Sequence, residues 1–235
     1  MLKQGIKVME LCKEAISSTS KYKDISEKYC HQEKGHSGGC SEYPYLAHLK
    51  TEHKRVAAKV VRDSTMTTGA AWKSKDAGPN RILRWVMLLS DAELLQFGLD
   101  MSLMKPGVVA KLREKSATYQ ECMLVAGKLA TLVYQMPDAP DCPAKIKSYL
   151  EERFGAFTKD STTCIVCREP LSFALFQVAL RGKAEIETAH SNPRTHSDEN
   201  VGFAHRDCNI AQGNKTLNEF YQWIEGILVR VNNSN

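Results

Sequence analysis

Apolar residues recur at helical spacing through most of the first 155 residues. This pattern predicts helices over 3–18, 45–62, 81–89 and 145–154, a short helical turn over 24–29 and a long helical run over 108–136. Ser90 and Glu93 have the spacing of a capping box, which predicts that another helix begins there. No segment in this part alternates with period two. The pattern therefore predicts a mainly α-helical region.

Polar stretches rich in glycine or proline interrupt these helices. They cover 31–44, 65–80 and 137–143, and they predict irregular connections because glycine makes a continued helix costly and proline ends it. A small, polar stretch over 155–163 follows the last of these helices. We expect a domain boundary there, at about residue 160.

The pattern changes after Cys167. Residues 171–180, 184–191 and 200–204 are typical of short strands, and the spacing is helical again from His205 onward. The coarse order is thus two strands followed by a helix. The sequence predicts an α+β protein, with a mainly helical domain over 1–160 and a second domain over 161–235.

The positive charge of the chain is unevenly distributed. The formal net charge is +5, and residues 1–160 hold 25 Lys and Arg against 19 Asp and Glu, while 161–235 hold 7 against 8. A basic excess can replace the counterions around a polyphosphate, so it favours nucleic acid as a partner; solvated surface charge is the alternative. The N-terminus lacks the features of a signal peptide, and the longest apolar stretch, 123–136, is too short to cross a bilayer. We expect a cytoplasmic protein without a membrane role.

Eight cysteines are spread over the chain, and reduced thiols are the expected state for a protein without a secretion signal. Cys164 and Cys167 form one pair with two residues between them, and His205 and Cys208 form another. Two such pairs can close a tetrahedral zinc site in which every position is filled by the protein, so the zinc would be structural. Four unrelated buried residues are the alternative.

A second group of possible zinc ligands lies within eleven residues and consists of Cys30, His36 and Cys40. His31 or His48 could complete it. The alternative is a glycine-rich surface loop with incidental histidines. The three cysteines without nearby partners are expected to be buried apolar residues; they are Cys12, Cys122 and Cys142.

The second domain carries a motif with several fixed offsets. The matching residues are Ala189-His190, Pro193, Asn200, Cys208-Asn209 and Lys215-Thr216-Leu217. Over about residues 164–220, this arrangement resembles the HNH family of ββα-metal nucleases. The resemblance implies a zinc-stapled nuclease domain that hydrolyses phosphodiester bonds.

His190 is the candidate general base, because a neutral imidazole can take a proton from water near physiological pH. A packed core histidine is the alternative. The resemblance implies that Asn200 orients this imidazole through a hydrogen bond across the hairpin. It also implies that the amide oxygen of Asn209 binds a divalent cation, Mg²⁺ or Mn²⁺, at the scissile phosphate.

Ala189 departs from the pattern of the family, in which many members carry an aspartate at this position as a second metal ligand. A methyl group cannot coordinate a metal ion. Either Asn209, phosphate and water hold the ion alone, or another side chain substitutes for the aspartate. The candidates by proximity in sequence are His196, Asn192 and Glu187.

The predicted DNA-binding residues are basic side chains of both domains. Lys54, Arg55, Lys59 and Arg62 recur at helical spacing and could face phosphate; a solvated helix face is the alternative. Arg194 and Arg206 are the candidates in the second domain, and solvated arginine is again the alternative.

In its size, its single nuclease module and its additional basic domain, the chain looks like a type II restriction endonuclease. Such an enzyme would cut double-stranded DNA at a specific sequence, and by analogy we expect a homodimer. Two other classes remain open: an HNH nuclease that depends on methylated cytosine, and a non-catalytic zinc-containing DNA-binding protein in which Ala189 marks a decayed site.

Overall fold

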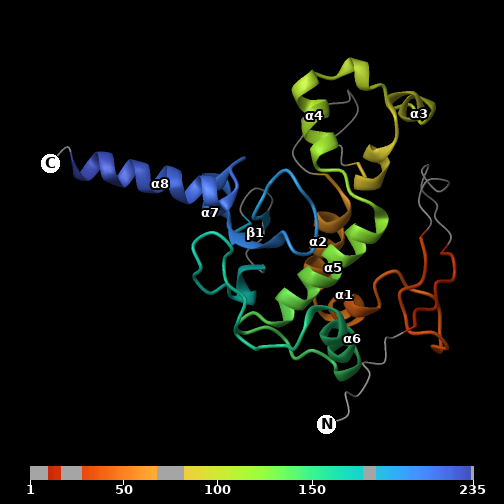
Figure 1. Cartoon of the computed structure of the whole chain (residues 1–235). Coiled ribbons are helices and arrows are strands. Elements are labelled where there is room, and N and C mark those ends of the chain that lie inside the picture. Colours follow the sequence, from red (N-terminus) through yellow and green to blue (C-terminus); the bar gives the residue numbers. More distant parts are fainter. Residues whose placement is uncertain (1–9, 17–27, 68–81, 177–183, 234–235) are drawn as a thin grey trace, which may run out of the picture.

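The computed structural model describes residues 10–16, 28–67, 82–176 and 184–233 (Figure 1). The predicted helix over 3–18 is wrong in its described part, because residues 10–16 are extended. Leu11 pairs with Glu33 and Ala15 pairs with Tyr29 in isolated antiparallel bridges. The rest of that helix, most of the turn over 24–29 and most of the connection over 65–80 lie outside the described residues.

From Pro44 to residue 160 the described chain is mainly helical, as predicted. Its elements are η1 (Pro44–Leu46), α1 (Ala47–Glu52), α2 (Lys54–Thr65), η2 (Arg84–Leu88), α3 (Asp91–Gln96), η3 (Met101–Leu103), α4 (Pro106–Glu114), α5 (Tyr119–Tyr134) and α6 (Ala144–Phe154). The capping box of Ser90 and Glu93 is confirmed at the start of α3. The run predicted over 108–136 is divided between α4 and α5, and a 3-10 helix occupies most of 81–89.

Helix α5 is the central element of this part. Thr118 and Glu121 cap its first turn reciprocally, so its start is fixed by local hydrogen bonds. Most of its side chains are buried, and α2, α6 and the second strand contact it. A helix that is apolar on most of its faces must be covered on several sides. It therefore positions α2 beside the strands.

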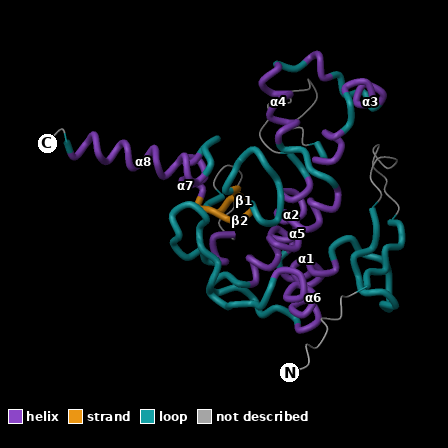
Figure 2. The backbone as a smooth tube through the Cα atoms, viewed as in Figure 1, coloured by secondary structure: helices purple, strands orange, loops and turns teal. Residues whose placement is uncertain are grey.

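Two short strands form the only sheet among the described residues (Figure 2). Strand β1 (Ile186–His190) pairs with β2 (Val201–His205) in antiparallel register, with Ala189 opposite Gly202. Helices α7 (Arg206–Gln212) and α8 (Leu217–Asn232) follow. The predicted order of two strands and a helical segment is confirmed, but the strand predicted over 171–180 is wrong: Phe173–Phe176 form the 3-10 helix η4, and 177–180 lie outside the described residues.

Apolar side chains from both sides of residue 160 belong to one continuous core. Leu129 and Val133 of α5 and Phe203 of β2 are fully buried in it. The division into two domains at residue 160 stays a prediction. Within the described ranges, no helix combines the length and the apolar character that crossing a membrane requires.

Gly202 is the one strand position where the packing excludes any side chain larger than hydrogen. A Cβ added there would overlap the Cγ2 methyl group of Ile165, which lies between two predicted zinc ligands. Overpacking of this kind costs about 1 to 3 kcal/mol. We expect Gly202→Ala to lower the free energy of unfolding by that amount, measured by denaturant titration.

Gly226→Ala is the matched control, because Gly226 lies in α8 and its added Cβ would meet only the mobile end of Arg230. Alanine in a helix is favoured over glycine by roughly 0.5 to 1 kcal/mol, so this variant should be at least as stable as the wild type. Equal stabilities of the two variants would contradict the close packing at Gly202.

Candidate active site

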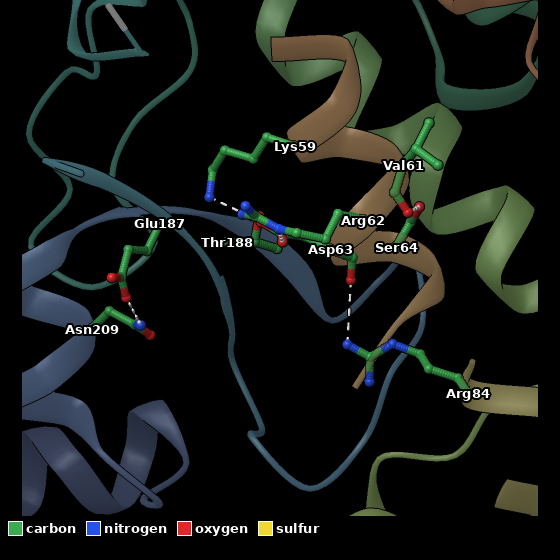
Figure 3. Close-up of polar contacts among 9 residues, drawn as sticks. All are labelled: Lys59, Val61, Arg62, Asp63, Ser64, Arg84, Glu187, Thr188 and Asn209. Carbon is green, nitrogen blue, oxygen red and sulfur yellow. Dashed lines mark hydrogen bonds and ion pairs between the residues drawn. The ribbon is translucent and has the colours of Figure 1, made fainter. Parts of the chain in front are cut away.

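A pocket of about 230 Å³ lies where α2, β1 and α7 meet. His190, Glu187 and Asn209 line it from the strand and from α7, and Lys59 and Arg62 line it from α2. Figure 3 shows Glu187 and Asn209 on one side and the residues of α2 on the other. The structure thus brings the predicted residues His190 and Asn209 to one cavity.

A chain of hydrogen bonds fixes the tautomer of His190. The Nε2 atom of His196 is 2.8 Å from the carbonyl oxygen of Ser64, so this nitrogen must donate. Neutral His196 then accepts at Nδ1, which is 3.0 Å from Nε2 of His190. His190 therefore donates from Nε2. Its Nδ1 carries no proton and is the basic atom.

The surroundings of His190 keep it neutral. Burial lowers its pKa to about 3, and the positive charges of Arg84 and Lys115 act in the same direction. Burial lowers the pKa of His196 as well. Both imidazoles are therefore in the neutral form that the hydrogen-bond chain requires.

Asn200 has a different role from the predicted one. Its side-chain oxygen accepts from Ser191 Oγ and from the backbone N–H of Asn192, and its amide donates to the carbonyl groups of Asn192 and Thr195. Asn200 thus holds the loop after β1. In place of the predicted hydrogen bond with Asn200, the imidazole of His190 donates from Nε2 to Nδ1 of His196.

Gln212 is a site residue that the sequence reasoning missed. It is buried, and its amide donates to the carbonyl oxygen of His190 at 2.9 Å and to that of Lys215 at 3.0 Å. It ties the end of α7 to the end of β1. A glutamine three residues after Asn209 gives no signal of its own in the sequence.

Glu187 and Asn209 are hydrogen-bonded to each other, with 2.6 Å between Asn209 Nδ2 and Glu187 Oε2. Of the three candidates for the missing metal ligand, Glu187 alone lines the pocket. Both ring nitrogens of His196 are engaged, by His190 and by Ser64. The side-chain oxygen of Asn192 accepts from the backbone N–H of Arg194 within its own loop.

Asp63, near the end of α2, is a buried acid that the sequence reasoning also missed. Its carboxylate accepts from Lys59 at 2.9 Å, from Arg62 and, across the interface, from Thr188 Oγ1 of β1 at 2.9 Å. Burial opposes its ionisation, but Arg62 and Lys59 outweigh this effect and hold its pKa below the usual value. The carboxyl group of Asp63 also accounts for the raised pKa of Arg62.

The predicted DNA-binding residues separate into two sets. Lys59 and Arg62 line the pocket of His190, and Arg55 shares a neighbouring hollow with them. The other candidates, which do not line the pocket, are Lys54, Arg55, Arg194 and Arg206. Lys54 and Arg194 are exposed, and Arg206 is half-buried at the start of α7.

The four predicted ligands of the structural zinc come together. The metal-binding atoms of Cys164, Cys167, His205 and Cys208 all lie within 4.8 Å of one another, and 3.4 Å separates Cys167 Sγ from His205 Nδ1. Ligand atoms at about 2.0 to 2.3 Å from a tetrahedral zinc ion lie roughly 3.5 to 3.8 Å apart. The donor set and its spacing fit zinc.

The second predicted group of zinc ligands also comes together, and it contains one residue that the sequence reasoning did not include. Cys12 joins Cys30, His36 and Cys40, and the four ligand atoms lie within 4.8 Å of one another. The interpretation of Cys12 as a buried apolar residue is therefore wrong. His31 stacks on Tyr29 and His48 contacts Tyr134, so neither completes the group.

Comparisons with known proteins agree with this architecture. The family model DraIII matches residues 42–208. A solved structure described as a type II restriction endonuclease is 44% identical, covers 95% of this chain and 99% of its own, and superposes with a TM-score of 0.83. No curated protein matches the chain. On the extent of the family match and the identity over nearly the whole length, this chain belongs to the DraIII family.

Proposed function

We propose that this protein is a DNA endonuclease of the type II restriction class, in which His190 is the general base. The restriction endonuclease with 44% identity over nearly the whole chain supports the substrate and the reaction. The observation that carries the mechanism is the chain of hydrogen bonds from His190 through His196 to Ser64, which leaves Nδ1 of His190 as the basic atom of a residue that lines a pocket with cations and oxygen ligands.

His190 would take a proton from the attacking water through Nδ1, while its Nε2–H stays bound to His196. A pKa of about 3 describes the pocket without substrate. A phosphodiester brings negative charge beside the imidazole and raises its pKa toward the range in which a general base is effective. The positive charges of Arg84 and Lys115 keep the imidazole of His190 neutral before DNA binds.

Glu187 and Asn209 are the residues that would hold Mg²⁺ or Mn²⁺. Oxygen ligands are what these cations prefer, and one carboxylate with one amide beside a phosphate suits such a site. When bound, the cation neutralises charge on the phosphate and on the departing oxygen. Asn209 now presents its Nδ2 to Glu187. Rotation of the side-chain amide would exchange the positions of Oδ1 and Nδ2 and place the oxygen beside the Glu187 carboxylate.

Lys59 and Arg62 would bind the DNA backbone at the reacting phosphate. Each is held by Asp63 and has a donor to spare, because a lysine carries three N–H groups and an arginine five. Fixed donors lose less entropy on binding than free surface side chains. Helix α2 would thereby take part in catalysis as well as in DNA recognition.

Replacing His190 by alanine tests the general base. We expect cleavage of plasmid DNA with Mg²⁺ or Mn²⁺ to fall by about 10²- to 10⁴-fold while DNA binding in a gel-shift assay is kept. Unchanged cleavage would contradict the assignment. A wild-type protein that shifts DNA but never cuts it would favour the non-catalytic DNA-binding protein.

The products of the same assay distinguish the remaining classes. Discrete fragments are expected from a sequence-specific enzyme, and a smear would indicate a non-specific nuclease. Cleavage restricted to methylated plasmid would favour the methylcytosine-dependent class.

His196 offers a test of the hydrogen-bond chain by itself. His196→Ala removes the acceptor for His190 Nε2–H, so we expect at least a tenfold loss of kcat with KM nearly unchanged. His196→Gln provides a carbonyl oxygen for His190 and an N–H for Ser64, and it should restore most of the activity. If both variants lose equal activity at equal thermal stability, His196 does not position the base.

We also propose that two chains associate through helix α8, which extends from the body of the molecule (Figure 1). Tyr221, Ile224, Leu228 and Val231 form a stripe at helical spacing, and Leu228 and Val231 are each 55% exposed. An apolar stripe that continues beyond the body is suited to a second copy of itself. A homodimer would place one nuclease site for each DNA strand.

Charge on this stripe should separate the two chains. We expect the double variant Leu228→Glu, Val231→Glu to be monomeric by light scattering at concentrations where the wild type is dimeric. Val229→Glu is the matched control, because Val229 is 53% exposed but lies beside the stripe. A monomeric wild type, or loss of the dimer in the control alone, would overturn this surface as the interface.

A further inference from the structure

We propose that Cys12, Cys30, His36 and Cys40 bind a structural zinc ion, separate from the nuclease module, that fastens residues 10–16 to residues 28–42. None of these four residues lines the pocket of His190. The region matched by the family model begins at residue 42, after the last of them.

The geometry of the group is that of a metal site. The sulfur of Cys30 is 3.4 Å from His36 Nε2, the sulfur of Cys40 is 3.9 Å from the same atom, and all four ligand atoms lie within 4.8 Å of one another. Thiols are weak hydrogen-bond partners and would not by themselves gather around one imidazole nitrogen. Three thiolates and one imidazole around zinc would lie roughly 3.5 to 3.8 Å apart, close to the 3.4 and 3.9 Å that separate His36 Nε2 from the two sulfurs.

The orientation of the His36 ring supports the same conclusion. Its Nδ1 is buried and has no hydrogen-bond partner among the described residues. The polar contacts of the ring are therefore those at Nε2, where the sulfurs of Cys30 and Cys40 lie. Nε2 is the ring atom that would bind the zinc ion.

The sulfur of Cys30 is prepared for a metal in the same way as that of Cys164 in the predicted zinc site of the nuclease module. The backbone N–H of Ser41 donates to Cys30, and the backbone N–H of Cys167 donates to Cys164. Both groups contain three cysteines and one histidine.

Cys40 shows what zinc binding would change. Its thiol donates to the Glu14 carboxylate at 3.0 Å. A bound Zn²⁺ ion would displace that proton to solvent, since the thiolate is the form that binds metal. Glu14 is exposed and would then be hydrated.

The contacts that hold this segment are mostly at its surface. Between residues 10 and 16 they are two isolated bridges, backbone hydrogen bonds to residues 28–34, an exposed ion pair of Glu10 with Lys34, the hydrogen bond from Cys40 to Glu14, and the packing of the partly buried Leu11 against the core. Residues 28–42 in turn contact α5, where Tyr119 donates to Glu42 at 3.0 Å and His31 lies beside the Tyr119 ring. A zinc ion would join residues 10–16 to residues 28–42, which contact α5.

Metal analysis of the full-length protein tests the proposal directly. We expect about two zinc ions per chain in the wild type and about one in Cys12→Ser. Cys122→Ser is the control, because Cys122 is buried in α5 and belongs to neither group; it should keep both ions. One ion in the wild type, or two in Cys12→Ser, would overturn the assignment.

Thiol protection in the wild type gives a second readout that does not depend on whether a variant folds. Cys40 is exposed and Cys12 is partly exposed, so free thiols there should react quickly with an alkylating reagent. We expect both to be protected in the native protein and to react together once a chelator removes zinc, as identified by peptide mass. Immediate alkylation of Cys12 and Cys40 before chelation would contradict the zinc site, and so would a disulfide linking the cysteines of the group.

Discussion

The end of helix α2 is the point on which the geometry of the candidate active site depends. Two consecutive residues there contact the strand region in different ways: the Asp63 carboxylate binds Thr188, and the Ser64 carbonyl binds His196. A hydrogen bond to an ionised group contributes about 1.5 to 3 kcal/mol, more than one between neutral groups. Asp63 therefore holds α2 and β1 in one arrangement. Through Ser64 and His196, that arrangement sets which nitrogen of His190 is free.

The contacts of Asp63 and Ser64 with the strand region also change the role expected of the helical part of the chain. From sequence, residues 1–160 are expected to recognise DNA while residues 161–235 cut it. The structure instead brings cations of α2 to the pocket that contains His190, and it gives both parts one core. With the proposed function, DNA recognition and hydrolysis would be mechanically connected. A DNA contact that shifted α2 would act on Asp63, and through it on the strand that carries the proposed base, His190.

The elements that sequence reasoning predicted well are those whose signal is local. The capping box of Ser90, the hairpin pattern and the pairs of zinc ligands each depend on residues close together in the chain. The failures involve contacts that are distant in sequence. Apolar spacing over 3–18 suggests a helix, but residues 10–16 are extended against 28–34, and Cys12 is 18 positions from its nearest partner, Cys30. The partnership of Ser64 and His196 spans 132 positions, and no local pattern encodes it.

Ala189 is the position at which the candidate site departs from the HNH pattern, and its surroundings give a physical reason for the departure. Its side chain is 1% exposed and belongs to the apolar core, opposite Gly202 on β2. An ionised aspartate at this position would be buried without a partner, at a cost of several kcal/mol. Glu187 lies two residues earlier on β1, about 7 Å along the strand, and its side chain is one methylene longer than that of aspartate. It enters the pocket and reaches Asn209. We infer that the carboxylate has moved along the strand to a position where solvent and cations can stabilise its charge.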